Sequence, residues 1–133
     1  MKTVSTVVRR PLEECWRAFT DTSQLTAWVP GLRAAWLIEP GAEGMPLAVQ
    51  FEFGPDLIYT LDYTYDRDEH VVRWTPREGE QGAVRGYARF APVDGGTEIT
   101  YALEHEPGRK AIERAIDDPK ILVDAFALLM HDR

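Results

Sequence analysis

The chain of 133 residues is poor in cysteine and in basic residues, and each shortage excludes a class of function. Cys15 is the only cysteine, so an internal disulfide and a cysteine metal cluster are excluded. The 15 Lys and Arg residues are outnumbered by 22 Asp and Glu residues, which gives a formal net charge of −7. Because nucleic acids and anionic membranes attract clustered positive charge, neither is expected as a partner.

Long apolar runs are missing too. No stretch approaches the roughly 20 consecutive apolar residues that a membrane-spanning helix needs. Residues 1–5 lead into a polar, alternating stretch without the apolar core of a signal peptide, so we expect a cytoplasmic protein. The length and the 44% content of hydrophobic residues fit a single globular domain over residues 1–133, with enough buried surface to fold without disulfides or metal.

Motifs of several enzyme classes do not occur. The chain has no glycine-rich phosphate loop, no His-Glu-x-x-His zinc pair and no Gly-x-Ser-x-Gly elbow. The spacing of its three histidines, His70, His105 and His131, suggests no metal site. We therefore expect no metal and no cofactor. Cys15 falls on an apolar helix face, where a thiol is more often a small buried hydrophobe than a nucleophile.

The first third of the chain predicts a strand and two short helices. Residues 2–9 alternate and are rich in Val and Thr, which is typical of a strand. Apolar residues then recur at helical spacing after Pro11, which predicts an amphipathic helix over residues 12–19. Residues 21–23 can cap a second short helix over residues 25–29. Trp16 and Trp28 lie on the apolar stripes of these helices, so both are expected to support the fold and, at most, a pocket entrance.

From Leu32 to Glu106 the hydrophobic period changes from 3.6 to 2, with turn residues between short apolar segments. This pattern predicts an antiparallel β-meander with strands at residues 33–39, 46–53, 57–66, 70–76, 83–91 and 97–105. The sequence Asp94-Gly95-Gly96 supplies the positive φ that a tight hairpin requires. The alternation separates an apolar face, which must be covered, from a face exposed to solvent.

The C-terminal segment is the predicted cover. Apolar residues recur at helical spacing from residue 109 to residue 131, which predicts a long helix. Pro119 interrupts the pattern, because a mid-helix proline removes a hydrogen bond and clashes with the preceding turn. The segment is therefore either one kinked helix or two helices, the second capped by Asp118.

Three segments resemble the START/SRPBCC superfamily, which includes birch pollen allergen-like proteins, polyketide cyclases and dehydrases, and Hsp90-activator homologues. They are RPLEECWRAFTD at residues 10–21, LTAWVPG at residues 25–31 and FAPVDGGTEIT at residues 90–100. The resemblance implies an α+β helix-grip fold, in which about seven antiparallel strands curve around a long C-terminal helix and two short helices follow the first strand. It also implies a cavity between sheet and helix. Pro119 departs from the usual uninterrupted C-terminal helix.

Aromatic residues gather on the inward face of the predicted sheet. Tyr59, Tyr63 and Tyr101 place three phenols there, and Trp74 joins them if the turn at residues 66–69 keeps register. Buried Tyr and Trp need partners for their polar atoms, which a ligand in a cavity can supply. Gly86 and Ala88 fill little space under the long helix, which favours a cavity. The alternative is a solid core in which apolar side chains repack across the gap.

With the resemblance, these observations favour a pocket of roughly a few hundred Å³. The candidate ligand-binding residues are Phe51, Tyr59, Leu61, Tyr63, Trp74, Gly86, Ala88, Tyr101, Leu103, His105 and Phe126.

The predicted function is binding of a small hydrophobic or aromatic molecule that is polyketide-, lipid- or metabolite-like. One alternative, implied by the resemblance, is a polyketide cyclase or dehydrase in which the pocket phenols or His105 act as acid or base. The other is a protein-interaction module of the Hsp90-activator type. That module needs an apolar outer sheet face, whereas the predicted outer face is polar and carries Thr60, Asp62, Thr64, Thr100 and Glu104.

Overall fold

The computed structural model of the chain describes residues 2–77, 84–104 and 118–132. Within these residues, seven strands form one antiparallel sheet in the order β1-β7-β6-β5-β4-β3-β2. The strands are β1 (Lys2–Val8), β2 (Ala34–Pro40), β3 (Pro46–Gly54), β4 (Leu57–Asp66), β5 (Val71–Pro76), β6 (Arg85–Val93) and β7 (Gly96–Glu104). The predicted meander is confirmed, because every predicted strand is present within about two residues of its expected bounds.

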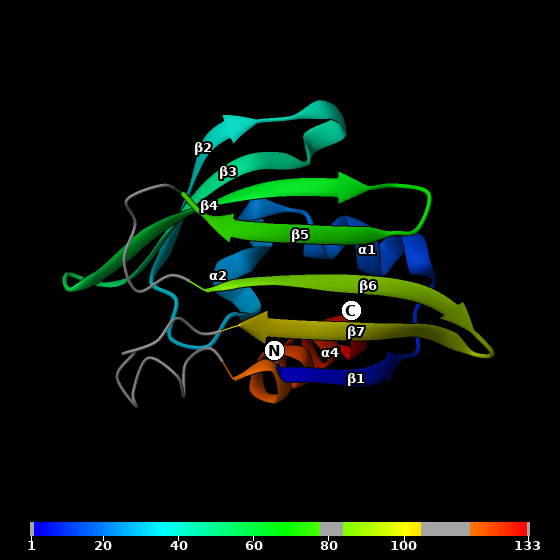
Figure 1. Ribbon diagram of the computed structural model, residues 1–133. Coiled ribbons are helices and arrows are strands. Elements are labelled where there is room, and N and C mark those ends of the chain that lie inside the picture. The colour runs from blue at the N-terminus through cyan, green and yellow to red at the C-terminus, as the bar shows by residue number, and fades with distance from the viewer. Residues whose placement is uncertain (1, 78–83, 105–117, 133) are drawn as a thin grey trace.

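The described helices cover one face of this sheet, which Figure 1 shows from the opposite side. They are α1 (Leu12–Phe19), α2 (Leu25–Trp28) and α4 (Pro119–His131), with short 3-10 turns at Thr22–Gln24 and Ala42–Gly44. Helix α1 packs on β6 and β7, and α4 packs on β1, β7 and α2. The helix-grip architecture expected from the sequence is therefore present.

Capping residues explain where the helices begin. Pro11 precedes α1 in an extended conformation, and the Asp21 side chain accepts a hydrogen bond from the Ser23 N–H (3.0 Å) at the turn that leads into α2. Pro119 occupies the first turn of α4, and Asp118 caps it by accepting from the Lys120 N–H at 2.9 Å. The helix capped by Asp118, which is the second helix of the two-helix alternative, is thus present. The predicted helical residues 109–117 lie outside the described residues.

The core lies between the sheet and the helices. Trp16 and Trp28 are 7% and 6% exposed, so their predicted burial is confirmed. Cys15 is completely buried, and its burial raises the pKa of the thiol, which a nucleophilic cysteine would need lowered. The ring of Phe19 lies at the centre of this core, within 5.3 to 6.1 Å of five other aromatic rings.

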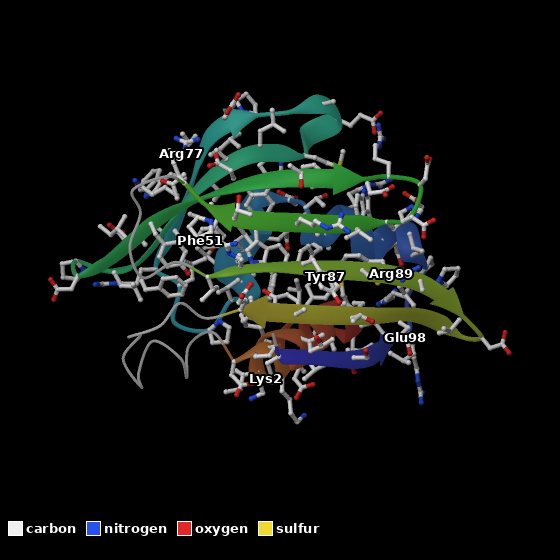
Figure 2. All side chains as sticks on the ribbon, in the orientation of Figure 1. Lys2, Phe51, Arg77, Tyr87, Arg89 and Glu98 are labelled. Carbon is white, nitrogen blue, oxygen red and sulfur yellow. The ribbon has the colours of Figure 1, made fainter. Side chains whose placement is uncertain are left out.

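The outer face of the sheet is largely polar but not uniformly so. Figure 2 shows Tyr87 and Arg89 on this face, away from the helices, and Arg89 forms an ion pair with Glu69 at 3.3 Å. Near the β2 edge, however, Trp36 is 56% exposed and Ile58 is 40% exposed. Their registers with β3 place both on the outer face, so the prediction of a polar outer face is wrong at this edge.

None of the described helices is long and apolar enough to cross a membrane.

We expect Asp118→Ala to lower the free energy of unfolding by about 1 kcal/mol, since the substitution removes the side-chain cap of α4. Chemical denaturation of both proteins measures the difference. Asp124→Ala is the matched control on the same helix, because Asp124 only forms an exposed ion pair with Lys120. Asp124→Ala should change the free energy of unfolding by no more than about 0.5 kcal/mol. Equal losses in the two variants would contradict the cap assignment.

The contribution of Asp118 should also depend on pH. Partial burial raises the pKa of its carboxyl group, but hydrogen bonds from the Lys120 N–H and the Lys2 ammonium lower it by more, so the pKa lies below its ordinary value. A carboxyl group with a lowered pKa stabilises the fold above its unfolded-state pKa and loses this effect as pH falls through the folded-state pKa. The difference in the free energy of unfolding between wild type and Asp118→Ala should therefore shrink as pH falls below about 4.

Candidate functional site

A cavity of about 40 Å³ lies between the inner face of the sheet and the helices. The described residues that line it come from both layers, and none of them is charged. The sheet side comprises Phe51, Phe53, Tyr59, Leu61, Tyr63, Trp74, Val84, Tyr101 and Leu103, and the helical side comprises Phe19, Leu25, Trp28, Val29 and Leu122. Eight of these fourteen side chains are aromatic, so the wall offers flat apolar surfaces to whatever enters.

The structure brings together seven of the residues expected at the site: Phe51, Tyr59, Leu61, Tyr63, Trp74, Tyr101 and Leu103. Gly86, Ala88 and Phe126 are buried but are not among the described residues that line the cavity. His105 lies outside the described residues. A role in ligand binding stays a prediction for all of them.

Sequence analysis missed most of the helical wall. Phe19, Leu25, Trp28 and Val29 lie in the two short helices that the sequence predicts at residues 12–19 and 25–29, and their apolar spacing indicates only that they pack on the sheet. The pattern could not show that the packed side chains would face a cavity, because that depends on how deeply the helices sit on the sheet. Phe53 shares the inward parity of Phe51 and could have been found from alternation alone.

Strand register places four cavity-side positions in one row across the sheet. Tyr63 pairs with Trp74, Trp74 with Gly86, and Gly86 with Leu103. A Cβ atom at position 86 would overlap the Ala102 carbonyl oxygen and lie 3.0 Å from both Leu103 Cδ2 and Trp74 Cζ2. Gly86 therefore does not leave an empty space, as the sequence suggested. The Trp74 and Leu103 side chains occupy the space that a residue with a side chain would need.

Closely packed rings explain the small volume of the cavity. Phe19 lies 5.4 Å from Trp28 and 6.1 Å from Trp74, and Trp74 lies 5.3 Å from Tyr101, measured between ring centroids. The remaining space of about 40 Å³ is far smaller than an ordinary ligand pocket, which has roughly 300 Å³ or more. The expected volume of a few hundred Å³ is therefore wrong for this conformation, because the helical aromatic residues fill space that the sequence left open.

Tyrosine hydroxyls are among the few polar groups of the wall. Burial, together with the neighbouring phenols of Tyr101 and Tyr65, raises the pKa of Tyr63 well above its ordinary value. The Tyr63 phenol therefore stays protonated at neutral pH and can donate a hydrogen bond. Tyr65, next to it, donates its own hydroxyl proton to the Pro46 carbonyl oxygen.

The indole nitrogen of Trp28 is the other polar group of interest. Trp28 lines the cavity, and its Nε1 atom is buried without a hydrogen-bond partner among the described residues. Such a group is uncommon, because a buried donor without a partner forfeits the hydrogen bond that water would give it.

The described histidines lie away from this cavity. Nε2 of His70 is 3.4 Å from the Glu13 carboxylate, and its ring is perpendicular to the Trp16 ring, with 5.3 Å between the ring centroids. Nε2 of His131 accepts a hydrogen bond from the Arg9 N–H at 3.1 Å. In the part of the chain that the structure describes, no three His, Cys, Asp or Glu residues are grouped so that they could hold a metal ion.

The seven-stranded antiparallel sheet with helices on one face is a helix-grip fold, and comparisons with solved structures agree. The fold resembles a START superfamily protein from Mycobacterium smegmatis, with a TM-score of 0.76 and 11% identity over 98% of this chain and 97% of that chain. It also resembles the Zhui aromatase/cyclase from Streptomyces, with a TM-score of 0.73 and 13% identity over 99% and 93% of the two chains. A STAR-related lipid transfer protein from Xanthomonas axonopodis gives a TM-score of 0.66 and 14% identity over 97% and 84%.

Residues 2–123 match the family described as polyketide cyclase / dehydrase and lipid transport. The chain belongs to this family. No curated protein matches it significantly.

Gly86→Ala tests the close approach of the Trp74 and Leu103 side chains. The added methyl group meets backbone that cannot move freely, so we expect a loss of about 1–3 kcal/mol in the free energy of unfolding. Gly54→Ala, at the end of β3, is the matched control, because a Cβ atom there has no neighbour within 4 Å. Thermal melts of both variants provide the comparison. A Gly86→Ala protein as stable as Gly54→Ala would show that position 86 is not crowded.

Proposed function

We propose that the chain binds a small apolar molecule with an aromatic ring system in the cavity between the sheet and the helices. The aromatic lining carries this proposal: eight of the fourteen described lining residues are aromatic and none is charged. Binding sites for small molecules are concave and mostly apolar, with a few polar groups that fix orientation. Flat rings offer the best contact to a flat ligand, since aromatic pairs gain about 0.5–1.5 kcal/mol beyond their buried area.

Entry of such a ligand requires the wall to move. The present volume of about 40 Å³ is too small for a ring system, so side chains on one side must shift. The helical side is the better candidate, because α2 has only four residues and its lining residues Leu25 and Trp28 lie on that single turn. The sheet side is held by the hydrogen-bonded ladders of neighbouring strands. Binding by displacement of α2 is part of this proposal, as is the expected cytoplasmic location.

Native mass spectrometry of the purified protein should detect a co-purifying apolar molecule, and added naphthalene should quench the tryptophan fluorescence. Val29→Phe should abolish both signals, because the larger ring fills a cavity of this size. Val7→Phe introduces the same change at an exposed position of β1 and should leave both signals intact. Binding that survives in Val29→Phe, in a protein that still folds, would place the ligand elsewhere.

Catalysis is the second candidate function, and the specific observation in its favour is the presence of three phenols in one cavity. Tyr63 keeps its proton, so it could donate to a carbonyl oxygen of a substrate, as an acid in a cyclisation or dehydration would. The family description names both cyclases and lipid transport, and it supports either candidate.

Single substitutions distinguish the two candidates once a ligand has been identified. In a binding protein, Tyr59→Phe, Tyr63→Phe or Tyr101→Phe should each weaken affinity by about 0.5–1.5 kcal/mol where a neutral hydrogen bond is lost. His105→Ala belongs to the same series. In an enzyme, one of the four should abolish turnover and leave affinity unchanged. Calorimetry measures the affinity, and chromatography of the ligand after incubation detects the product.

A further inference from the structure

The wall of the cavity contains a hydrogen-bond donor that the described residues do not satisfy. Trp28 is 6% exposed, lines the cavity, and its Nε1–H has no partner among the described residues. An indole N–H can only donate, and it cannot change this property by losing a proton at physiological pH. Displacement of α2, which carries Trp28, is the step that can bring a ligand acceptor to this atom.

We propose that the Trp28 indole N–H selects ligands that carry a carbonyl or equivalent neutral oxygen acceptor on an apolar ring system. This inference rests on the proposed function and adds the chemistry by which the ligand is recognised and oriented. The described wall holds no charged side chain that would pair with an ionised ligand, so a neutral acceptor is the better match.

The aromatic neighbours of Trp28 offer no acceptor to its N–H. The indole ring is packed against Phe19 at 5.4 Å and Phe126 at 5.2 Å, measured between ring centroids. Neither phenyl ring offers a carbonyl or hydroxyl oxygen, so neither can accept the hydrogen bond of the indole N–H. A ligand oxygen must reach the edge of the ring that carries Nε1, and this requirement would orient the rest of the ligand.

Tyr63 adds a second donor to the same cavity. Its phenol stays protonated because burial raises its pKa, and it lines the sheet side of the cavity, whereas Trp28 lines the helical side. The lining thus offers donors from both layers, which again favours a ligand rich in acceptors. A hydrocarbon would leave the Trp28 donor unsatisfied and would bind less well for that reason.

A double-mutant cycle with two matched probes tests the inference. The probes are the ketone indanone and the hydrocarbon indane, which share one ring skeleton and differ by the carbonyl group. Calorimetry gives the dissociation constants of both probes for the wild type, Trp28→Phe and the matched control Trp36→Phe, whose indole lies on the outer face and is 56% exposed. The cycle cancels the difference in hydration between the probes.

Trp28→Phe should weaken indanone binding by roughly 2- to 13-fold more than indane binding, because it removes one neutral hydrogen bond. Trp36→Phe should change neither constant. If both probes bind the wild type and Trp28→Phe affects them equally, the inference is overturned while the proposed function stands. If neither probe binds the wild type, the proposed function fails and the inference fails with it.

If Trp28→Phe does not fold, NMR spectroscopy of the wild type tests whether the ligand accepts a hydrogen bond from the Trp28 indole. The four tryptophans give four indole N–H signals in an NMR spectrum, which single Trp→Phe variants at the other three positions assign by elimination. Indanone should shift the Trp28 signal downfield, as a new hydrogen bond does, and indane should not. An equal response to both probes would contradict the inference.

Discussion

The ring of Phe19 connects the helical layer to the sheet, and the shape of the cavity depends on it. It stands at the end of α1 and contacts rings of two other helices and three strands: Trp28, Phe126, Trp74, Phe90 and Tyr101. Each such pair contributes about 0.5–1.5 kcal/mol beyond its buried area, so the cluster holds α1, α2 and α4 at one depth above the sheet. That depth sets the distance between the two walls and hence the volume between them.

Gly86 provides the corresponding constraint within the sheet. Because position 86 has no side chain, Trp74 and Leu103 approach each other across β6, and the Trp74 ring extends toward Phe19. The small volume of the cavity is thus the joint result of a missing side chain in one layer and a crowded ring in the other. A ligand that displaces α2 must separate Trp28 from Phe19, and the contacts it makes must exceed those it breaks.

Much of the fold could be predicted from alternation and spacing, because these patterns record which face of each element is buried. The same patterns located the inward positions of Tyr59, Tyr63 and Tyr101. They failed where the outcome depends on packing between layers. The absence of a side chain at Gly86 suggests extra space in the cavity. The structure shows the opposite, because the side chains of Trp74 and Leu103 occupy that space. Likewise, an apolar helix stripe does not reveal whether its residues meet a solid core or line a cavity, as Trp28 does.

The chemistry of the wall favours recognition over reaction. A general acid or base works best when its pKa lies near the operating pH, whereas burial moves the pKa of Tyr63 further above neutrality. A phenol of this kind donates a hydrogen bond and keeps its proton. The Trp28 indole has the same character, because its N–H donates and does not titrate. Two donors that hold their protons, set among apolar rings, can orient an acceptor-bearing ligand, and neither is suited to removing a proton from it.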